Sequence, residues 1–248
     1  FCDRAILLEN GRQVFIGSSA EATKHYYLLH QTNGRGPAAG PVDQAAVPAL
    51  KIPVPEKSSS FWPQDEAFQS ALELPQIGNG WGKCVRYTVC DDSGVARNSF
   101  AQGETAVFYY EFLLSKAIAV PLGGIVLQNH RGINVHGKGS LEYASEAPDF
   151  LPAGSIIRCR QHVELKLEIG EYSYELGLAS IDPEGYRALS KLNHEQLFGR
   201  IFRICHLPGA GVISIGWRSV WKGAHLTHHG VADLPGRFEF EFGTNTAE

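Results

Sequence analysis

The sequence has no methionine and no long hydrophobic run. No stretch of about eighteen consecutive apolar residues occurs in the chain, which excludes a membrane-spanning helix. The N-terminus also lacks the basic, apolar and small-residue regions that make up a signal peptide. We therefore expect a soluble chain that is not secreted.

An excess of charge of one sign is also lacking. The chain has 22 Lys+Arg against 26 Asp+Glu, for a formal net charge of -4 at pH 7. A chain with this balance has no general electrostatic attraction to nucleic acid or to anionic lipid. Nucleic acid is therefore not an expected partner.

Cysteines are few, and none forms a C-x-x-C pair. The sequence has 5 of them: Cys2, Cys84, Cys90, Cys159 and Cys205. On one strand, Cys84 and Cys90 would share a face at about 20 Å from each other, which is too far for a disulfide. The sequence predicts free thiols in a reducing compartment, most of them acting as small buried apolar residues.

What is present favours β structure. Hydrophobic residues make up 44% and aromatics 10%, with 27 Gly and 13 Pro, and the apolar runs are short and separated by turn signals. We expect an all-β fold, an antiparallel immunoglobulin-like (jelly-roll-like) sandwich. The predicted strands span 81–91, 105–115, 124–128, 133–137, 156–168, 172–180, 200–206, 212–221 and 237–242.

The chain divides into three segments. Residues 1–30 predict a hairpin with an Asn-Gly turn, then a short helix with Ser18 and Glu21 in capping-box spacing, and this unit is too small to fold alone. Residues 31–65 are rich in Pro, Gly and Ala and predict a linker. Residues 66–248 carry the core.

Two stretches resemble a known family. "FCDRAILLENGRQVFIG" followed by "SSAEATKHYY" is similar to the last hairpin and helix of an ABC transporter nucleotide-binding domain, with the pattern falling on Cys2, Asp3, Arg4, Glu9 and Gly11. "IGNGWGKCVRYTVCDDSGV" and, further on, "ELKLEIGEYSYELGLA" resemble the C-terminal polysaccharide-binding domain of the ATP-binding subunit of O-antigen (Wzt-type) ABC exporters. The resemblance covers residues 1–30 and most of 75–180.

This resemblance implies a non-catalytic role. The chain would recognise O-antigen polysaccharide, at its non-reducing terminus, for export across the bacterial inner membrane. A homodimer, contact with the exporter's transmembrane subunit and a cytoplasmic location at that membrane are implied as well, and no cofactor is expected. The alternative is a structural or regulatory domain that docks a partner enzyme or the transporter without binding sugar.

Two motifs suggest chemistry that their context does not support. The stretch 132–138 fits the phosphate-loop pattern G-x-x-x-x-G-K, but Gly139 stands where Ser or Thr would bind Mg²⁺, and a strand-turn-strand unit explains it better. His225, His228 and His229 lack nearby carboxylate or thiolate partners. The sequence therefore predicts neither ATP hydrolysis nor a metal site.

Sugar recognition requires exposed aromatic rings beside planar hydrogen-bonding groups. In "TAVFYYEFLL", alternation places Phe108, Tyr110 and Phe112 in the core and Tyr109 with Glu111 on the other, exposed face. Tyr109 is thus a candidate sugar contact, and an ordinary solvated face is the alternative.

The densest group of planar polar side chains lies in "QNHRGINVHGKG". Arg131 there suits an acidic sugar, which a guanidinium binds bidentately. A polar hairpin turn explains the same pattern equally well. The candidate sugar contacts of this stretch are Gln128, His130, Arg131, Asn134 and His136.

A second candidate surface contains Arg218 and Trp221. Trp217 and Trp221 lie four apart on a predicted strand, on one face and about 13 Å from each other. We expect at least one of these two rings in the sandwich core.

The C-terminal stretch "RFEFEF", residues 237–242, alternates strictly between phenylalanine and charged residues. Such a strand, left unpaired, exposes its hydrogen-bonding groups and its rings. We expect it to pair with a sheet edge and to help form the dimer interface.

Overall fold

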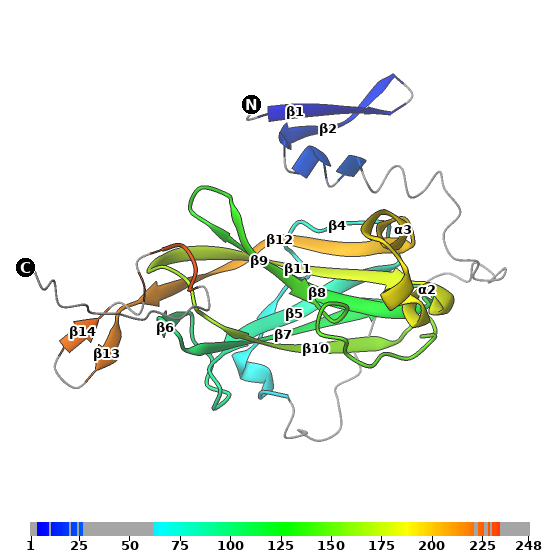
Figure 1. Ribbon diagram of the computed structural model, residues 1–248. Coiled ribbons are helices and arrows are strands. Elements are labelled where there is room, and N and C mark those ends of the chain that lie inside the picture. Colours follow the sequence, from blue (N-terminus) through cyan, green and yellow to red (C-terminus); the bar gives the residue numbers. More distant parts are fainter. Residues whose placement is uncertain are drawn as a thin grey trace, which may run out of the picture.

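The molecule is a sandwich of two β-sheets with a few short helices. The computed structural model describes residues 4–9, 11–19, 21–23, 25–26, 62–220, 223–225, 228 and 230–233. One sheet has four strands and the other six, and nearly all neighbouring strands are antiparallel. The two sheets form the body of the molecule in Figure 1. The predicted all-β sandwich is confirmed.

The N-terminal hairpin forms as the sequence predicts. Strands β1 (Arg4–Glu9) and β2 (Arg12–Ser18) pair antiparallel. Gly11 in the turn has a φ of 77°, which glycine adopts without steric penalty. The Ser18 hydroxyl accepts a hydrogen bond from the Glu21 amide at 3.2 Å, and the Glu21 carboxylate accepts one from the Ser18 amide at 3.4 Å. This reciprocal pair confirms the capping box.

The smaller sheet contains the strands that were clearest in the sequence. Its order is β10 (Ile156–Glu164), β7 (Thr105–Leu114), β5 (Gly82–Cys90) and β3 (Gln69–Ser70). The strands predicted at 81–91 and 105–115 correspond nearly residue for residue to β5 and β7, because each has a turn signal at its end.

The larger sheet carries the longest strands. Its order is β4 (Ile77–Gly78), β12 (Ile201–Gly216), β11 (Gly170–Ile181), β8 (Val120–Asn129) and β9 (Asn134–Gly139), and β6 (Ser99–Ala101) runs parallel to part of β12. The sequence predicted separate strands at 200–206 and 212–221, whereas β12 continues through Pro208 and Gly209. A Pro-Gly pair usually ends a strand, but here pairing with β11 extends along both halves of β12.

Short helices lie between β11 and β12, where the sequence indicated only a turn. They are α2 (Pro183–Arg187), η2 (Leu189–Lys191) and α3 (His194–Phe198), and a further helical turn, η1 (Asp65–Ala67), precedes β3. The Asp182 side chain accepts from the Gly185 amide at 2.7 Å and caps α2. The remaining described strands are β13 (Arg218–Val220) and β14 (Gly223–His225).

The core fills the space between the two sheets. Phe108, Tyr110 and Phe112 of β7 are buried in one cluster with Leu176 and Leu178 of β11. The inward set predicted for β7 is therefore confirmed. Each such large side chain contributes roughly 1.5–3 kcal/mol when it is removed from water.

A β-bulge changes the face of the sheet on which successive side chains of β5 lie. The register with β7 shifts between Cys84 and Arg86, so Val85 is an extra residue. Cys84 consequently lies in the core between the sheets, while Cys90 lies in a separate cluster on the outer face. The prediction that Cys84 and Cys90 share a face is wrong for this reason. The four described cysteines are free thiols, as predicted.

The outer face of the smaller sheet is covered. Trp62 lies edge-on to the Tyr109 ring at 5.5 Å between centroids and stacks on Phe68 at 5.1 Å. Tyr109 is only 7% exposed as a result. Its predicted exposure is wrong, because the segment that precedes β3 folds back over this face.

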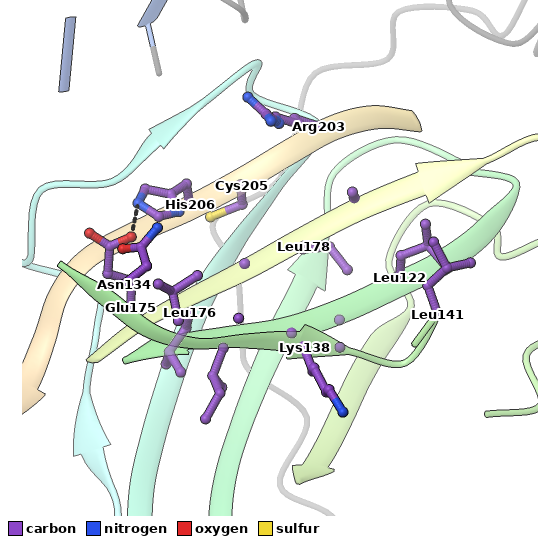
Figure 2. A pocket seen from close by; sticks show the side chains of 18 of the residues that line it. Leu122, Asn134, Lys138, Leu141, Glu175, Leu176, Leu178, Arg203, Cys205 and His206 are labelled. Atoms are coloured by element: carbon purple, nitrogen blue, oxygen red, sulfur yellow. Dashed lines mark ion pairs between the residues drawn. The ribbon is translucent and has the colours of Figure 1, made fainter. Parts of the chain in front are cut away.

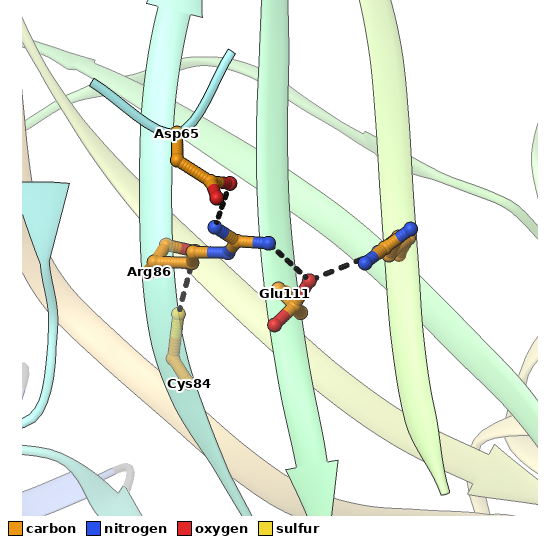
Figure 3. A network of polar contacts seen from close by, with 5 residues as sticks. Asp65, Cys84, Arg86 and Glu111 are labelled. Atoms are coloured by element: carbon orange, nitrogen blue, oxygen red, sulfur yellow. Dashed lines mark hydrogen bonds and ion pairs between the residues drawn. The ribbon is translucent and has the colours of Figure 1, made fainter. Parts of the chain in front are cut away.

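Glu111 is also buried on this face, at 1% exposure, contrary to the prediction of an exposed pair with Tyr109. Its carboxylate accepts hydrogen bonds from Arg86 at 3.2 Å and Arg158 at 3.0 Å. Arg86 donates in turn to Asp65 at 2.6 Å. Figure 3 shows this chain of contacts, which ties the segment containing Asp65 to the sheet.

Some predictions fall on residues outside the described ranges. They include Cys2, residues 31–61 of the predicted linker, the tryptophan at 221, His229 and the strand at 237–242. Within the described ranges, no helix combines the length and apolar character needed to cross a bilayer.

Candidate functional site

A groove of ≈ 780 Å³ lies on the outer face of the larger sheet. Side chains alternate along β11, so Tyr174, Leu176 and Leu178 fill the core while Glu175 and Gly177 face outward. The neighbouring strands β8, β9 and β12 supply most of the remaining lining. Figure 2 shows the groove from close by.

Glycines form the floor of the groove. Gly177 of β11 pairs with Gly124 of β8, which pairs with Gly139 of β9, so three adjacent outward positions carry no side chain. A Cβ added at Gly139 would lie 2.9 Å from the Gly124 Cα, whereas one added at Gly177 would meet only the Gly124 carbonyl oxygen, at 3.8 Å. Close approach of strands explains Gly139. Gly177 has no such packing requirement, and its missing side chain leaves the groove open.

One end of the groove is polar. The Glu175 carboxylate lies 3.3 Å from His206 Nε2, and the Gln128 side-chain amide donates to Glu175 at 3.4 Å and to the Asn134 side-chain oxygen at 3.0 Å. Four strands thus contribute one planar polar group each. This is the kind of surface that hydrogen-bonds sugar hydroxyls.

The other end is apolar. Leu122 of β8 and Leu141 lie there, at the far side of the groove from Glu175 in Figure 2. Ala179 and Ile201 add to the same lining. A groove with hydroxyl-binding groups at one end and aliphatic side chains at the other suits a ligand with polar and apolar faces, as sugar rings have.

Gln128 and Asn134 are the two predicted site residues that line the groove. They lie on adjacent strands and hydrogen-bond to each other, as a polar hairpin would. His130 and Arg131 lie at the exposed hairpin tip, where the Arg131 amide donates to the Asn129 side chain at 3.0 Å. The structure therefore divides the predicted cluster between the groove and the tip beside it.

The other predicted contacts are elsewhere. His136 pairs with Leu127 and shares its core-facing side, and burial lowers the pKa of its imidazole. Arg218 is exposed on β13, outside the groove lining. Trp217 is 53% exposed, and Trp221 lies outside the described residues. Tyr109 lies buried on the opposite sheet.

Glu175, His206 and the glycine row are site residues that sequence reasoning missed. A glycine inside a strand pattern signals close backbone approach or an open surface. "GGIVLQ" and "YELGLAS" carry that signal at Gly124 and Gly177. Only the strand register brings these glycines into one row beside His206.

The stretch that fits the phosphate-loop pattern forms the strand-turn-strand unit that the sequence indicates, and His229 of the histidine motif lies outside the described residues. Gly132–Lys138 is a turn followed by β9, and residues 140–150 continue as turns and irregular chain instead of a helix. Among the described residues, no group of three or more His, Cys, Asp or Glu side chains is placed to hold a metal ion.

Comparison with known proteins assigns the fold. Residues 75–188 match the family described as the Wzt C-terminal domain. A solved structure, the crystal structure of the C-terminal domain of wzt, is 14% identical, covers 71% of this chain and 92% of that chain, and has a TM-score of 0.52. Chicken MD-1 complexed with lipid IVa is 12% identical over 57% of this chain and 99% of that chain, at a TM-score of 0.24 that is too low to indicate a shared fold.

No curated protein matches the chain by sequence. The family match spans the chain from β4 to β11, a stretch that supplies all of the groove lining except the residues of β12. The sandwich of this chain therefore matches the Wzt C-terminal domain family over residues 75–188 and shares the fold of a solved Wzt C-terminal domain.

Proposed function

We propose that this domain recognises O-antigen polysaccharide, at its non-reducing terminus, for export by an ABC transporter, and does not alter the polymer chemically. The observation that carries the proposal is the groove floored by Gly124, Gly139 and Gly177, which leaves room for a sugar ring beside the polar end at Glu175. Its position in a Wzt-type domain supports a glycan as the ligand.

The proposal extends to the protein around the domain. Residues 1–30 would be the tail of a nucleotide-binding domain and residues 31–65 a linker to the sandwich at 66–248. The whole protein would act as a homodimer with the transmembrane subunit of the exporter, at the cytoplasmic side of the bacterial inner membrane. His130 and Arg131, at the hairpin tip, would contact sugar units outside the groove.

The direct test is calorimetric titration of the purified chain with O-polysaccharide from the organism that encodes it. We expect saturable binding to this polymer and none to the polysaccharide of an unrelated serotype. A chain that binds neither polymer would instead favour a domain that docks a protein partner.

A single substitution locates the binding site. Gly177→Val places a side chain in open space, with the nearest atom 3.8 Å from its Cβ, and valine suits a strand. We expect the affinity for polysaccharide to fall about tenfold or more, equivalent to about 1.4 kcal/mol, with little change in Tm.

Gly216→Val is the matched control. A Cβ there also has a backbone carbonyl oxygen, that of Phe100, as its nearest neighbour at 3.8 Å, but Gly216 lies on β12 outside the groove lining. This variant should bind as the parent does. Loss of binding in Gly216→Val alone would move the site to the surface around Arg218.

A further inference from the structure

We infer that the polar end of the groove selects an uncharged, hydroxyl-rich sugar unit over one that carries a carboxylate or phosphate, and that Glu175 determines this choice. The inference rests on the proposed function, since it concerns the same groove. It names the chemical class of the sugar unit that the groove accepts.

Glu175 is a buried carboxylate in the groove wall, with only 7% of its surface exposed. Removing a carboxylate from water is unfavourable unless other groups compensate its charge. Its contacts with His206 and Gln128 are 3.3 and 3.4 Å long, beyond the usual 2.7–3.2 Å range. Hydroxyl groups of a ligand, which donate short charge-assisted hydrogen bonds to a carboxylate, can therefore compete with these contacts.

A second carboxylate in the lining reinforces the same preference. The Glu142 side chain accepts a hydrogen bond from the Gly139 amide at 2.8 Å, which holds it at the edge of the glycine floor. An anionic sugar laid along the floor would thus approach two carboxylates. Like charges brought together at an interface oppose binding.

Two cationic side chains of the lining, Arg203 and Lys138, make contacts away from Glu175. The Arg203 guanidinium lies over the Phe198 ring at 5.2 Å, and the Lys138 ammonium lies 5.6 Å from the Tyr143 ring centroid. In Figure 2 both side chains lie away from Glu175. A carboxylate or phosphate on a sugar at the polar end would therefore meet Glu175 before it met a guanidinium.

The test compares two forms of one polymer. The probe is the O-polysaccharide of the encoding organism, and its partner is the same polymer after its primary alcohols have been oxidised to carboxylates. The parent chain should bind the oxidised form at least about tenfold more weakly, as expected for like-charge repulsion. Glu175→Gln should narrow this ratio to about threefold or less, because the amide keeps the shape without the charge.

His206→Gln is the matched variant, because it alters the same contact but keeps the Glu175 carboxylate. It should retain the preference for the unoxidised polymer. If the contact between Glu175 and His206 had only a structural role, the ratio of the two affinities would change equally in both variants. Equal binding of the two polymers by the parent chain would overturn the inference and leave the proposed function intact. Failure of the parent to bind the unoxidised polymer would overturn both.

Discussion

At the scale of single residues, Glu111 and Glu175 show how surroundings assign a role. Both are buried carboxylates on strands, at 1% and 7% exposure. Glu111 is enclosed by the guanidinium groups of Arg86 and Arg158 on a covered face. Glu175 faces a groove. Alternation in the sequence identifies the face of the strand on which a residue lies, but not what covers that face.

Glu111→Ala tests the structural role of the first carboxylate. Removing it leaves two arginines without their shared partner, and we expect the free energy of unfolding in urea to fall by about 2–3 kcal/mol. This is less than the roughly 3–5 kcal/mol for a fully buried pair, because both guanidinium groups keep some contact with water. Glu164→Ala, which removes a carboxylate paired with Lys166 at the surface, should change it by at most about 0.5 kcal/mol. Equal losses of unfolding free energy in the two variants would contradict the structural role assigned to Glu111.

At the scale of elements, the sequence predicts those features that local chemistry determines. The Asn-Gly hairpin and the Ser18–Glu21 capping box form as expected, because each depends on residues within a few positions of one another. The bulge at Val85 was missed, since a single extra residue is visible only in the register with β7. The cover over Tyr109 was missed for a similar reason, because Trp62 reaches it from a stretch that resembles a linker.

The segment Trp62–Phe68 should protect Cys90. Trp62, Cys90 and Tyr109 belong to one buried cluster, and burial raises the pKa of the Cys90 thiol. Trp62→Ala should expose this thiol and lower its pKa toward the ordinary value. Its rate of reaction with a disulfide reagent at pH 8 should then rise roughly tenfold, because the thiolate is the reactive form.

Identifying which cysteines react with the reagent distinguishes local opening of the Trp62–Phe68 segment from opening of the whole sandwich. Cys84 and Cys205 lie in the core between the sheets and should stay protected in Trp62→Ala, as mass spectrometry of the labelled peptides would show. Labelling of all three thiols at one common rate would mean that the substitution opens the whole sandwich. An unchanged reaction rate of the Cys90 thiol would show that Trp62 does not cover it.

At the scale of the whole molecule, composition and turn spacing are sufficient to predict a sandwich. They do not predict the groove, because Gly124, Gly139 and Gly177 come from three strands and meet only through pairing across the sheet. Gln128 and Asn134 were found because they are close in sequence as well as in space. Glu175 and His206 were not, since each lies alone in an apolar stretch.

Burial of thiols and phenols predicts how the stability of the molecule depends on pH. Burial raises the pKa of Cys205 to about 11 and that of Cys159 to about 12, and it raises the pKa values of Tyr110 and Tyr174 as well. These groups stay protonated in the folded chain at pH values where the unfolded chain has lost its protons. Stability should therefore be fully present below about pH 9 and fall as the pH rises toward 11.

The slope of this loss identifies the groups responsible. Each buried thiol that titrates only in the unfolded chain should remove roughly 1 kcal/mol per pH unit above pH 9. Urea unfolding at pH 7, 9 and 10.5 should thus give a falling free energy of unfolding. Cys205→Ala should give a shallower fall, whatever its stability at pH 7, because one titrating group is gone. If the free energy of unfolding of Cys205→Ala falls as steeply with pH as that of the parent, the folded structure does not raise the pKa of Cys205.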